Sequence, residues 1–369
     1  MSRAGPGYRL CERCFERQGG GFERVEGRLC FVCGGLLDGV PSMARKAVSK
    51  ARRHDFRTFT VGVSLPEGMQ EREDELRSDL KLKGKETIKT QAARLVADEV
   101  AAKLRKRVDR LRPDLTFLVS LGDGDVAVSS KPVYYYARYT KPAGVTQKRE
   151  FCGYCSGMGC KKCAQTGFDR KPSVETELRR KFAGFTGSEK MTFTWLGSED
   201  RDSRVFAPGR PFIVEVKNPV KRRIPKKFGA SFRGKRAAVA SGRVLSSKPV
   251  RLPTFRFRTE ISATAAKRVP KELLAELRGR FRGTEVVFER PHDRPVTKKV
   301  YRAEARAKGR TLTIDAELDG GLPVRRFVSG DLVSPSVSEV LKTEVRCRTF
   351  DIREVRETGK LELGEITRV

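Results

Sequence analysis

Histidine is scarce in this chain, and long hydrophobic runs are missing. The two histidines, His54 and His292, stand far apart without metal-ligand spacing, so we expect both to be structural or solvent-facing. No apolar run approaches the roughly 18–20 residues that cross a bilayer, and the first residues lack the hydrophobic stretch of a signal peptide. The sequence therefore predicts a cytoplasmic protein with no membrane partner.

Acidic residues are too few to balance the basic ones. The chain of 369 residues has 46 Asp and Glu against 78 Lys and Arg, a net charge of +32. Such a field destabilises the compact state unless a polyanion offsets it, and nucleic acid is the commonest polyanion. The alternatives are a solvated basic surface, which thermophile proteins usually balance with Glu, and a membrane surface, which favours cations clustered on one amphipathic helix. The charge therefore favours a nucleic-acid partner.

Eight of the nine cysteines form CxxC pairs, which indicate metal more readily than disulfides in a chain without a secretory signal. In the first group fifteen residues separate the two pairs, the spacing of a zinc ribbon. Two such pairs complete a tetrahedral shell with no position for substrate, so the predicted site is structural; a pair of disulfides is the alternative. The first group is Cys11, Cys14, Cys30 and Cys33.

The second group of cysteines surrounds a short glycine-containing turn, which can close on one ion without straining the backbone. We expect zinc here too, with a reduced, metal-free hairpin as the alternative. Cys347 has no partner in the pattern and is expected to be a small buried hydrophobe. The second group is Cys152, Cys155, Cys160 and Cys163.

Regular patterning begins near Phe56. It predicts strands at Phe59–Val63 and Leu115–Val119 and an amphipathic helix over Ile88–Val108, whose apolar residues recur four apart. Tyr134–Tyr139 lies between lysines and arginines, which suits stacking on unpaired bases; a strand whose tyrosines cover a core is the alternative.

From about Ser173 the chain is rich in short strands, interrupted by one clear helix, Lys271–Arg278. Such a pattern predicts a mixed, mostly antiparallel sheet with helices on one face. The predicted strands are Met191–Trp195, Pro211–Val216, Thr254–Ile261, Glu285–Glu289, Val300–Ala305 and Thr311–Glu317.

An acidic segment, Leu196–Arg204, follows the strand that ends at Trp195. A glycine opens its turn, so we expect Asp200 to be presented at a strand end. Arg204 and Arg210 would lie nearby and favour the charged form of a carboxylate. Because such an anion repels RNA, its presence in a basic chain suggests catalysis; a surface cluster of salt bridges is the alternative.

Several motifs in the same order resemble the archaeal tRNA pseudouridine-54/55 synthases, which join a THUMP-containing accessory domain to a pseudouridine synthase domain. The resemblance covers nearly the whole chain and includes the first four cysteines. The matching segments are Arg72–Ser78, Ser130–Tyr134, Arg138–Gly144, Pro172–Glu175, Gly197–Arg204, Gly209–Phe212 and Ser329–Asp331.

This resemblance implies an α+β, multidomain chain: a zinc-ribbon and THUMP-like N-terminal part, and a catalytic domain with a mixed, mostly antiparallel central sheet. The expected divisions are a zinc-binding segment (1–45), a THUMP-containing RNA-binding domain (46–150), a cysteine-rich hairpin or linker (151–172) and a pseudouridine synthase domain (173–369).

The resemblance also implies a chemistry. Asp200 would attack the nucleoside of uridine 54 or 55 in the TΨC arm, and the uracil would rotate and rejoin through carbon. Arg325 matches the cation that pairs with this carboxylate. The partner would be tRNA, with no obligate protein partner and no organic cofactor, because nothing is oxidised and no group is donated; zinc would be structural.

Pro323 stands where the family has a tyrosine, and a proline can neither stack like that ring nor donate a hydrogen bond. Tyr301 is the candidate for the missing aromatic. The other residues expected to contact substrate are Arg204 and Arg210, and Ser198 replaces an arginine common in the family.

Two other functions fit the resemblance: a non-catalytic tRNA-binding protein, and a different THUMP-containing modifying enzyme. A methyltransferase needs a glycine-rich turn after a strand, and Leu121–Asp125 is too short a match. A thiolation enzyme needs a pyrophosphate loop for ATP, and the sequence has none. The cationic run Pro219–Lys227 suits a loop that grips RNA backbone, with a solvated loop as the alternative.

Overall fold

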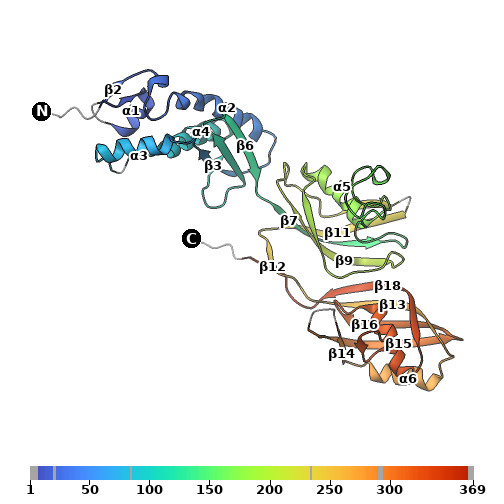
Figure 1. The fold of residues 1–369 in the computed structure, drawn as a ribbon. Helices are drawn as coiled ribbons and strands as arrows, with labels where there is room; N and C mark the ends of the chain where they lie inside the picture. The colour runs from blue at the N-terminus through green and yellow to red at the C-terminus, as the bar shows by residue number, and fades with distance from the viewer. Residues whose placement is uncertain (1–6, 20–21, 84, 233–234, 290–293, 365–369) are drawn as a thin grey trace. The chain divides into compact units, whose positions relative to one another are not determined.

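The computed structural model describes residues 7–19, 22–83, 85–232, 235–289 and 294–364. These residues form two compact units (Figure 1). The first contains residues 1–132 together with 217–222, and the second contains 133–216 and 223–369. Within the described ranges no helix is long and apolar enough to cross a membrane.

The first unit is built on a four-stranded sheet in the order β4-β3-β5-β6, in which β3 runs parallel to β4 and β5 and β6 is antiparallel. Phe59 and Phe117 are fully buried beneath helix α4, whose Ile88, Val96 and Val100 face the same core. The bounds are α1 (Glu12–Gln18), α2 (Val40–Ala51), β3 (Thr58–Ser64), α3 (Met69–Asp79), α4 (Ile88–Leu104), β4 (Arg107–Val108), β5 (Leu115–Ser120) and β6 (Asp125–Ser130), with the short β1 (Arg9–Leu10), β2 (Glu23–Arg24), η1 (Gly27–Leu29) and η2 (Leu36–Gly39) preceding α2.

A buried ion pair joins the N-terminal segment to this unit. Arg17 on α1 lies 2.9 Å from Glu73 on α3, and the same carboxylate accepts the backbone N–H of Ile88 at 2.9 Å. Both side chains are almost fully buried, so removing either partner would leave a costly unpaired charge. The pair thus fixes α1, which carries Cys14, against α3 and the start of α4.

The second unit contains one eleven-stranded mixed sheet in the order β10-β11-β7-β9-β18-β13-β16-β15-β14-β17, with β8 also paired to β9. All its pairings are antiparallel except β9 with β18, which meet through Val205 and Ile352. The strands are β7 (Val133–Lys141), β8 (Met191–Trp195), β9 (Val205–Val216), β10 (Phe228–Phe232), β11 (Lys235–Leu245), β13 (Phe255–Ala265), β14 (Thr284–Phe288), β15 (Val296–Lys308), β16 (Thr311–Asp319), β17 (Val333–Ser334) and β18 (Val345–Glu357), and β12 (Pro249–Arg251) pairs separately with β19 (Glu362–Leu363).

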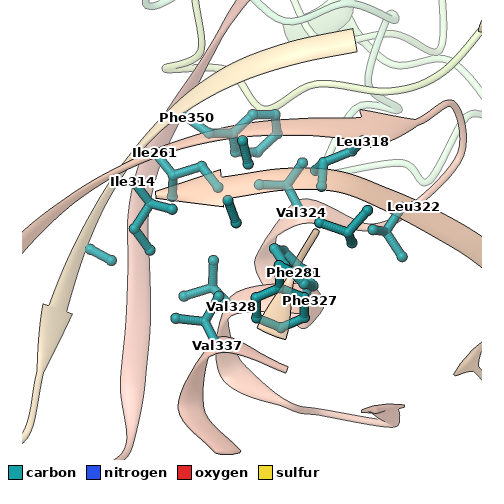
Figure 2. Packing of buried hydrophobic residues seen from close by; sticks show 14 of the residues in the cluster. Ile261, Phe281, Ile314, Leu318, Leu322, Val324, Phe327, Val328, Val337 and Phe350 are labelled. Atoms are coloured by element: carbon teal, nitrogen blue, oxygen red, sulfur yellow. The ribbon is translucent and has the colours of Figure 1, made fainter. Parts of the chain in front are cut away.

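Helices α6 (Lys271–Arg280), α7 (Val324–Ser329) and α8 (Val337–Val340) cover one face of the β13–β16 part of the sheet. Figure 2 shows Val324, Phe327 and Val328 of α7 pointing into this core, where the rings of Phe327 and Phe281 lie 5.0 Å apart. Because these three positions occupy one side of a helical turn, Arg325 is left on the outside of α7. The packing of α7 therefore decides which way Arg325 points.

The predicted α+β class and the mixed, mostly antiparallel sheet are confirmed. The strand predicted at Met191–Trp195 has the same bounds in the structure. One helix was predicted in this region, but α5 (Val174–Thr186) is a second long one, capped by the Ser173 hydroxyl. Its buried Val174, Leu178 and Phe182 recur four apart, so the helical signal was present in the sequence.

The division between the units differs from the expected boundary at residue 150. Strand β7 pairs with β9 and β11 in the large sheet, so residues from Val133 belong to the second unit. Tyr135, Tyr136 and Tyr139 on this strand are buried, at no more than 3% exposed, which makes them core residues. The base-stacking interpretation of these three tyrosines is therefore wrong, because the strand is central and both of its faces are covered.

Candidate active site

The acidic loop, residues 196–204, joins β8 to β9 in the second unit. Gly197 has φ +102°, and a Cβ there would lie 1.9 Å from the guanidinium of Arg210, so the loop turns where only glycine fits. Asp200 lies near the middle of this loop and is partly exposed. The strand-end position expected for Asp200 is where the structure places it.

Asp200, in the acidic loop, pairs with Arg325 on α7. Nε of Arg325 donates to Oδ2 of Asp200 at 2.5 Å; the Arg325 side chain is 49% exposed and that of Asp200 is 35% exposed. The same guanidinium donates to the backbone carbonyls of Cys347 at 3.0 Å and Arg348 at 3.2 Å. Three acceptors therefore hold Arg325 in place, and Asp200 is fixed by one partner while it stays open to solvent.

The buried Lys141 side chain stabilises the acidic loop. Its ammonium group is buried at the end of β7 and donates to the backbone carbonyls of Asp200 at 2.9 Å, Arg201 at 3.1 Å and Ser203 at 2.5 Å. It also donates to the carbonyl of Val145 at 2.8 Å. Because this buried cation contacts three carbonyls of the acidic loop, it fixes the path of the loop. Lys141 therefore positions Asp200 from within the protein, where it is not open to solvent.

A second buried network fixes the start of the acidic loop. The carboxylate of Glu199, whose side chain is fully buried, pairs with Arg210 at 3.1 Å and accepts hydrogen bonds from Gln147 and the hydroxyl of Tyr139. Gln147 also donates to the carbonyl of Gly197 at 3.0 Å. Burial and the Glu199 charge raise the pKa of Tyr139 well above its ordinary value, so the phenol stays a donor. Glu199 is thus a structural anion next to the exposed Asp200.

We expect the catalytic rate to depend on the proton of Lys141. Burial lowers the pKa of Lys141 from 10.5 to about 8, so above that pH the amine loses one of the donors that hold the loop carbonyls. The first-order rate at saturating substrate should fall as pH rises above about 8. The free energy of unfolding should not fall over the same pH range. The unfolded chain binds this proton more tightly than the folded chain, so between pH 8 and 10.5 the folded protein loses the proton and no longer has to bury the lysine charge.

Lys141→Met supplies the comparison for this pH profile. The variant fills a similar volume but leaves the loop carbonyls without their donor, so its rate should be about 10- to 100-fold lower at neutral pH and should lack the decline above pH 8. Rates and thermal melting measured side by side from pH 6.5 to 9.5 check this. An unchanged alkaline decline in the variant would assign that decline to another group.

The four residues predicted to contact substrate lie in different environments. Arg204 pairs with Asp351 at 2.7 Å and remains 55% exposed. Arg210 is buried, and its guanidinium is occupied by Glu199 and by the carbonyls of Leu196 and Ser198. In contrast to the prediction, Arg210 supports the acidic loop from inside, because the tight turn at Gly197 closes over it.

Tyr301 and Pro323 lie on different elements, strand β15 and the start of helix α7. Tyr301 lies on β15, where its hydroxyl donates to Asp319 at 2.9 Å and the Arg256 guanidinium covers its ring at 3.5 Å. It lines an arginine-rich surface cavity of about 330 Å³, and Asp200 is not among the residues that line this cavity. Pro323 caps the N-terminus of α7, two positions before Arg325.

The cationic run Pro219–Lys227 is partly structural. Arg222 donates to the hydroxyl of Ser130 at 3.0 Å and to the carbonyl of Lys131 at 2.8 Å, and burial lowers its pKa. The neighbouring Lys221 and Arg223 are exposed and remain available to a polyanion. His54 lies beside this segment, where burial lowers its pKa, whereas His292 lies outside the described residues.

Each group of four cysteines converges on one point. Within each group the sulfur atoms all lie within 4.8 Å of one another, for example Cys11 and Cys33 at 3.5 Å and Cys152 and Cys160 at 3.9 Å. Four thiolates bound tetrahedrally at about 2.3 Å stand about 3.8 Å apart, and a disulfide needs about 2.05 Å. The spacing fits a metal ion and does not fit disulfides. Cys347 is half-buried, and burial raises its thiol pKa to about 11.

The supporting residues Lys141, Gln147 and Glu199 were not predicted from the sequence. Lys141 falls in the matched segment Arg138–Gly144, yet only the pairing of β7 with β9 shows that it lies against the acidic loop. Glu199 lies within that loop, in the matched segment Gly197–Arg204, and its burial is seen only in the structure. Gln147 has no signal in the sequence.

The chain is similar in sequence to known proteins over most of its length. Residues 43–120 match the family model of the archaeal Pus10 THUMP domain, and residues 135–244 match that of the Pus10 C-terminal region. The tRNA pseudouridine synthase Pus10 of Nitrosopumilus maritimus is 30% identical over 88% of this chain and 85% of its own length. Its counterpart in Cenarchaeum symbiosum is 30% identical over 95% of this chain and 90% of its own.

Among solved structures, a Cbf5-Nop10-Gar1 complex aligns with 60% of this chain and 48% of its own chain, at 12% identity and a TM-score of 0.33. The two family-model matches fall in different units, and the second, residues 135–244, includes the acidic loop that carries Asp200. On these matches, the chain belongs to the Pus10 family of tRNA pseudouridine synthases.

Proposed function

We propose that this protein converts uridine to pseudouridine in the TΨC arm of tRNA, with Asp200 as the nucleophile. The observation that carries the proposal is the contact between Asp200 and Arg325, a half-open carboxylate held at 2.5 Å by a guanidinium that three acceptors fix in place. A rigid, solvent-accessible anion on a basic protein suits attack on a nucleoside better than it suits RNA binding.

The proposed reaction conserves every atom of the nucleoside. The Asp200 carboxylate forms a bond to the nucleoside, the glycosidic C–N bond breaks, and its electron pair leaves with the uracil. The uracil rotates, and its C5 forms the new glycosidic bond while the carboxylate is released. C5 loses a proton and N1 gains one, so neither an oxidant nor a group donor is consumed. Dividing the exchange into two steps lowers the barrier of each.

Arg325 has two tasks in this scheme. Its Nε orients the Asp200 carboxylate through a hydrogen bond. Its positive charge reduces the electrostatic repulsion between that carboxylate and the polyanionic RNA. Pro323 is the N-cap of α7, where its ring restricts φ, and so helps to set the direction of the helix that carries Arg325. Tyr301 and Arg204 remain proposed substrate contacts, since both are partly exposed.

The proposed substrate is tRNA with its TΨC loop unfolded locally. A base must leave its stack to reach a side chain, which costs a few kcal/mol, and a net charge of +32 provides binding free energy to offset that cost. The N-terminal unit, with its THUMP match, would hold the body of the RNA.

An unmodified tRNA transcript tests the proposal and identifies the position. Incubated with the protein and no cofactor, the transcript should gain pseudouridine at position 54, 55 or both, mapped by chemical modification and primer extension. Transcripts with U54→C or U55→C should each keep the reaction at the remaining uridine if both positions are used. A transcript that is bound but never modified would leave a tRNA-binding protein in place of an enzyme.

Zinc is the metal we propose for both groups of cysteines, because tetrahedral thiolate sites favour it. Metal analysis of the purified protein should find close to two zinc ions per chain. Cys14→Ser should lower the count to about one and destabilise the first unit, since Cys14 is fully buried beside Arg17. Cys347→Ser is the control and should keep both ions. A count near one in the unaltered protein would show that one group binds no metal.

A further inference from the structure

The cysteine hairpin, residues 151–172, exposes large apolar side chains on a strongly hydrophilic protein. Phe151 is 68% exposed, Tyr154 is 74% exposed and Met158 is 88% exposed. All three lie within eight positions along the chain, next to the second group of cysteines. Clustered exposed aromatics usually mark a binding surface, whereas single exposed hydrophobes do not.

The Phe151 ring of the hairpin is held in place by close packing contacts. Phe151 stacks on Phe168 with 5.4 Å between ring centroids and an 18° interplanar angle, and the two residues also form a β-bridge. A Cβ at Gly157 would lie 3.0 Å from the Phe151 ring, so the backbone packs closely against it. A ring that is already fixed loses little conformational entropy when a ligand stacks on it.

Cations accompany these rings. The Lys162 ammonium lies 3.3 Å from the Tyr154 ring centroid, and the Arg149 guanidinium lies 3.8 Å from that of Phe168. Residues 148–172 contain six basic and two acidic residues, and the segment stays cationic even with the two extra negative charges of a zinc tetrathiolate. Rings interleaved with cations suit a partner that offers both flat faces and negative charge.

The hairpin is anchored to the same segment that fixes the acidic loop. Gln147 donates to Gly197 and Glu199, while three residues further on the Glu150 carbonyl accepts the N–H of Asp169 at the base of the hairpin. Lys171, paired with Asp169 at 2.8 Å, lies close enough to Arg201 for the two charges to interact. The base of the hairpin therefore lies beside the acidic loop, within one compact unit.

We propose that the exposed face of the cysteine hairpin, formed by Phe151, Tyr154, Met158, Lys161 and Lys162, binds unpaired nucleotides of the RNA on which Asp200 acts. The inference rests on the proposed function for the identity of that RNA. Unpaired bases offer free faces for stacking, which a duplex hides inside its helix. A protein partner would match the apolar atoms but would leave the two lysines without counter-charges, so the observations favour RNA.

Equilibrium binding of an unmodified tRNA transcript to the full chain tests this surface. Phe151→Ala and Tyr154→Ala should each weaken binding about tenfold, the change expected from losing one base stacked on a ring. Val250→Ala is the matched control, because Val250 is 69% exposed and lies on β12, outside the hairpin. It should bind like the unaltered protein, and all variants should keep two zinc ions.

A fully paired RNA duplex distinguishes stacking from charge. Its affinity should not change in Phe151→Ala or Tyr154→Ala, and equal losses on duplex and transcript would overturn the stacking role. Crosslinking works on the unaltered protein, so it does not depend on how a variant folds. A transcript containing 4-thiouridine should crosslink to the tryptic peptide 150–161.

The two proposals fail in different ways. Unchanged affinities together with no crosslink on peptide 150–161 would contradict the hairpin surface, even if pseudouridine forms, and would leave a protein partner as the occupant. Conversely, absence of pseudouridine with a clear loss of affinity in both ring variants would contradict the proposed function alone.

Discussion

Asp200→Asn is expected to lower the single-turnover rate of pseudouridine formation by about 10⁴-fold or more, the scale seen when a nucleophile is removed. The amide keeps the size and polarity of the side chain but cannot attack the nucleoside. Because Asp200 is partly exposed and its backbone carbonyl remains bonded to Lys141, the fold should be unaffected. Affinity for the transcript should stay the same or rise slightly, since one anion is removed from an RNA-binding surface.

Asp202→Asn is the matched control for this experiment. Asp202 lies on the same loop and is exposed, and it has the same charge. Its variant should react within about threefold of the unaltered rate, a change too small to reflect loss of a reacting group. Equal losses in both variants would mean that the charge of the loop matters and that neither carboxylate is the nucleophile.

Arg325→Met should lower the same rate by about 10²- to 10³-fold, the cost of losing one well-placed electrostatic contact in an active site. The carboxylate loses the one side chain that pairs with it among the described residues and can rotate away from the base. Stability should change little, because a half-exposed ion pair contributes about 1 kcal/mol or less. The defect should appear in the rate at saturating RNA and leave the apparent KM nearly unchanged.

Two further variants sharpen the interpretation of Arg325. Arg325→Lys keeps the charge but loses the planar fork that reaches Asp200 and two carbonyls together, so only partial activity should return. Arg346→Met removes an exposed cation from β18, where it pairs only with Glu344 among the described contacts, and should behave like the unaltered protein. A loss equal to that of Arg325→Met would indicate a general need for positive charge.

The location of Asp200 was predictable, whereas its support was not. A glycine after an apolar strand predicts a turn, and the structure places Asp200 in that turn. Its pairing with Arg325, 125 positions away, came from the family resemblance, since no local pattern joins the acidic loop to α7. Lys141 could not be distinguished in sequence from the other lysines, because its burial depends on the strand order β7-β9-β18.

Arginine and tyrosine gave the least reliable predictions, for a common physical reason. Both side chains combine an apolar body with a polar end, so the same residue suits a core or an RNA surface. Arg210 and Tyr139 became buried partners of Glu199, while Tyr154 and Phe151 stayed exposed on the hairpin. Whether such a side chain is buried or exposed depends on which elements pack over it, as they do over β7 and β9.

The most direct test is a single-turnover time course on one unmodified tRNA transcript, with the unaltered protein and Asp200→Asn compared at equal RNA occupancy. Pseudouridine at each nucleotide of the TΨC loop is the quantity to measure. We predict conversion at position 54 or 55 by the unaltered protein and no detectable conversion by the fully bound variant. Conversion by the variant at a similar rate would contradict the role of the Asp200 carboxylate and, with it, the proposed mechanism.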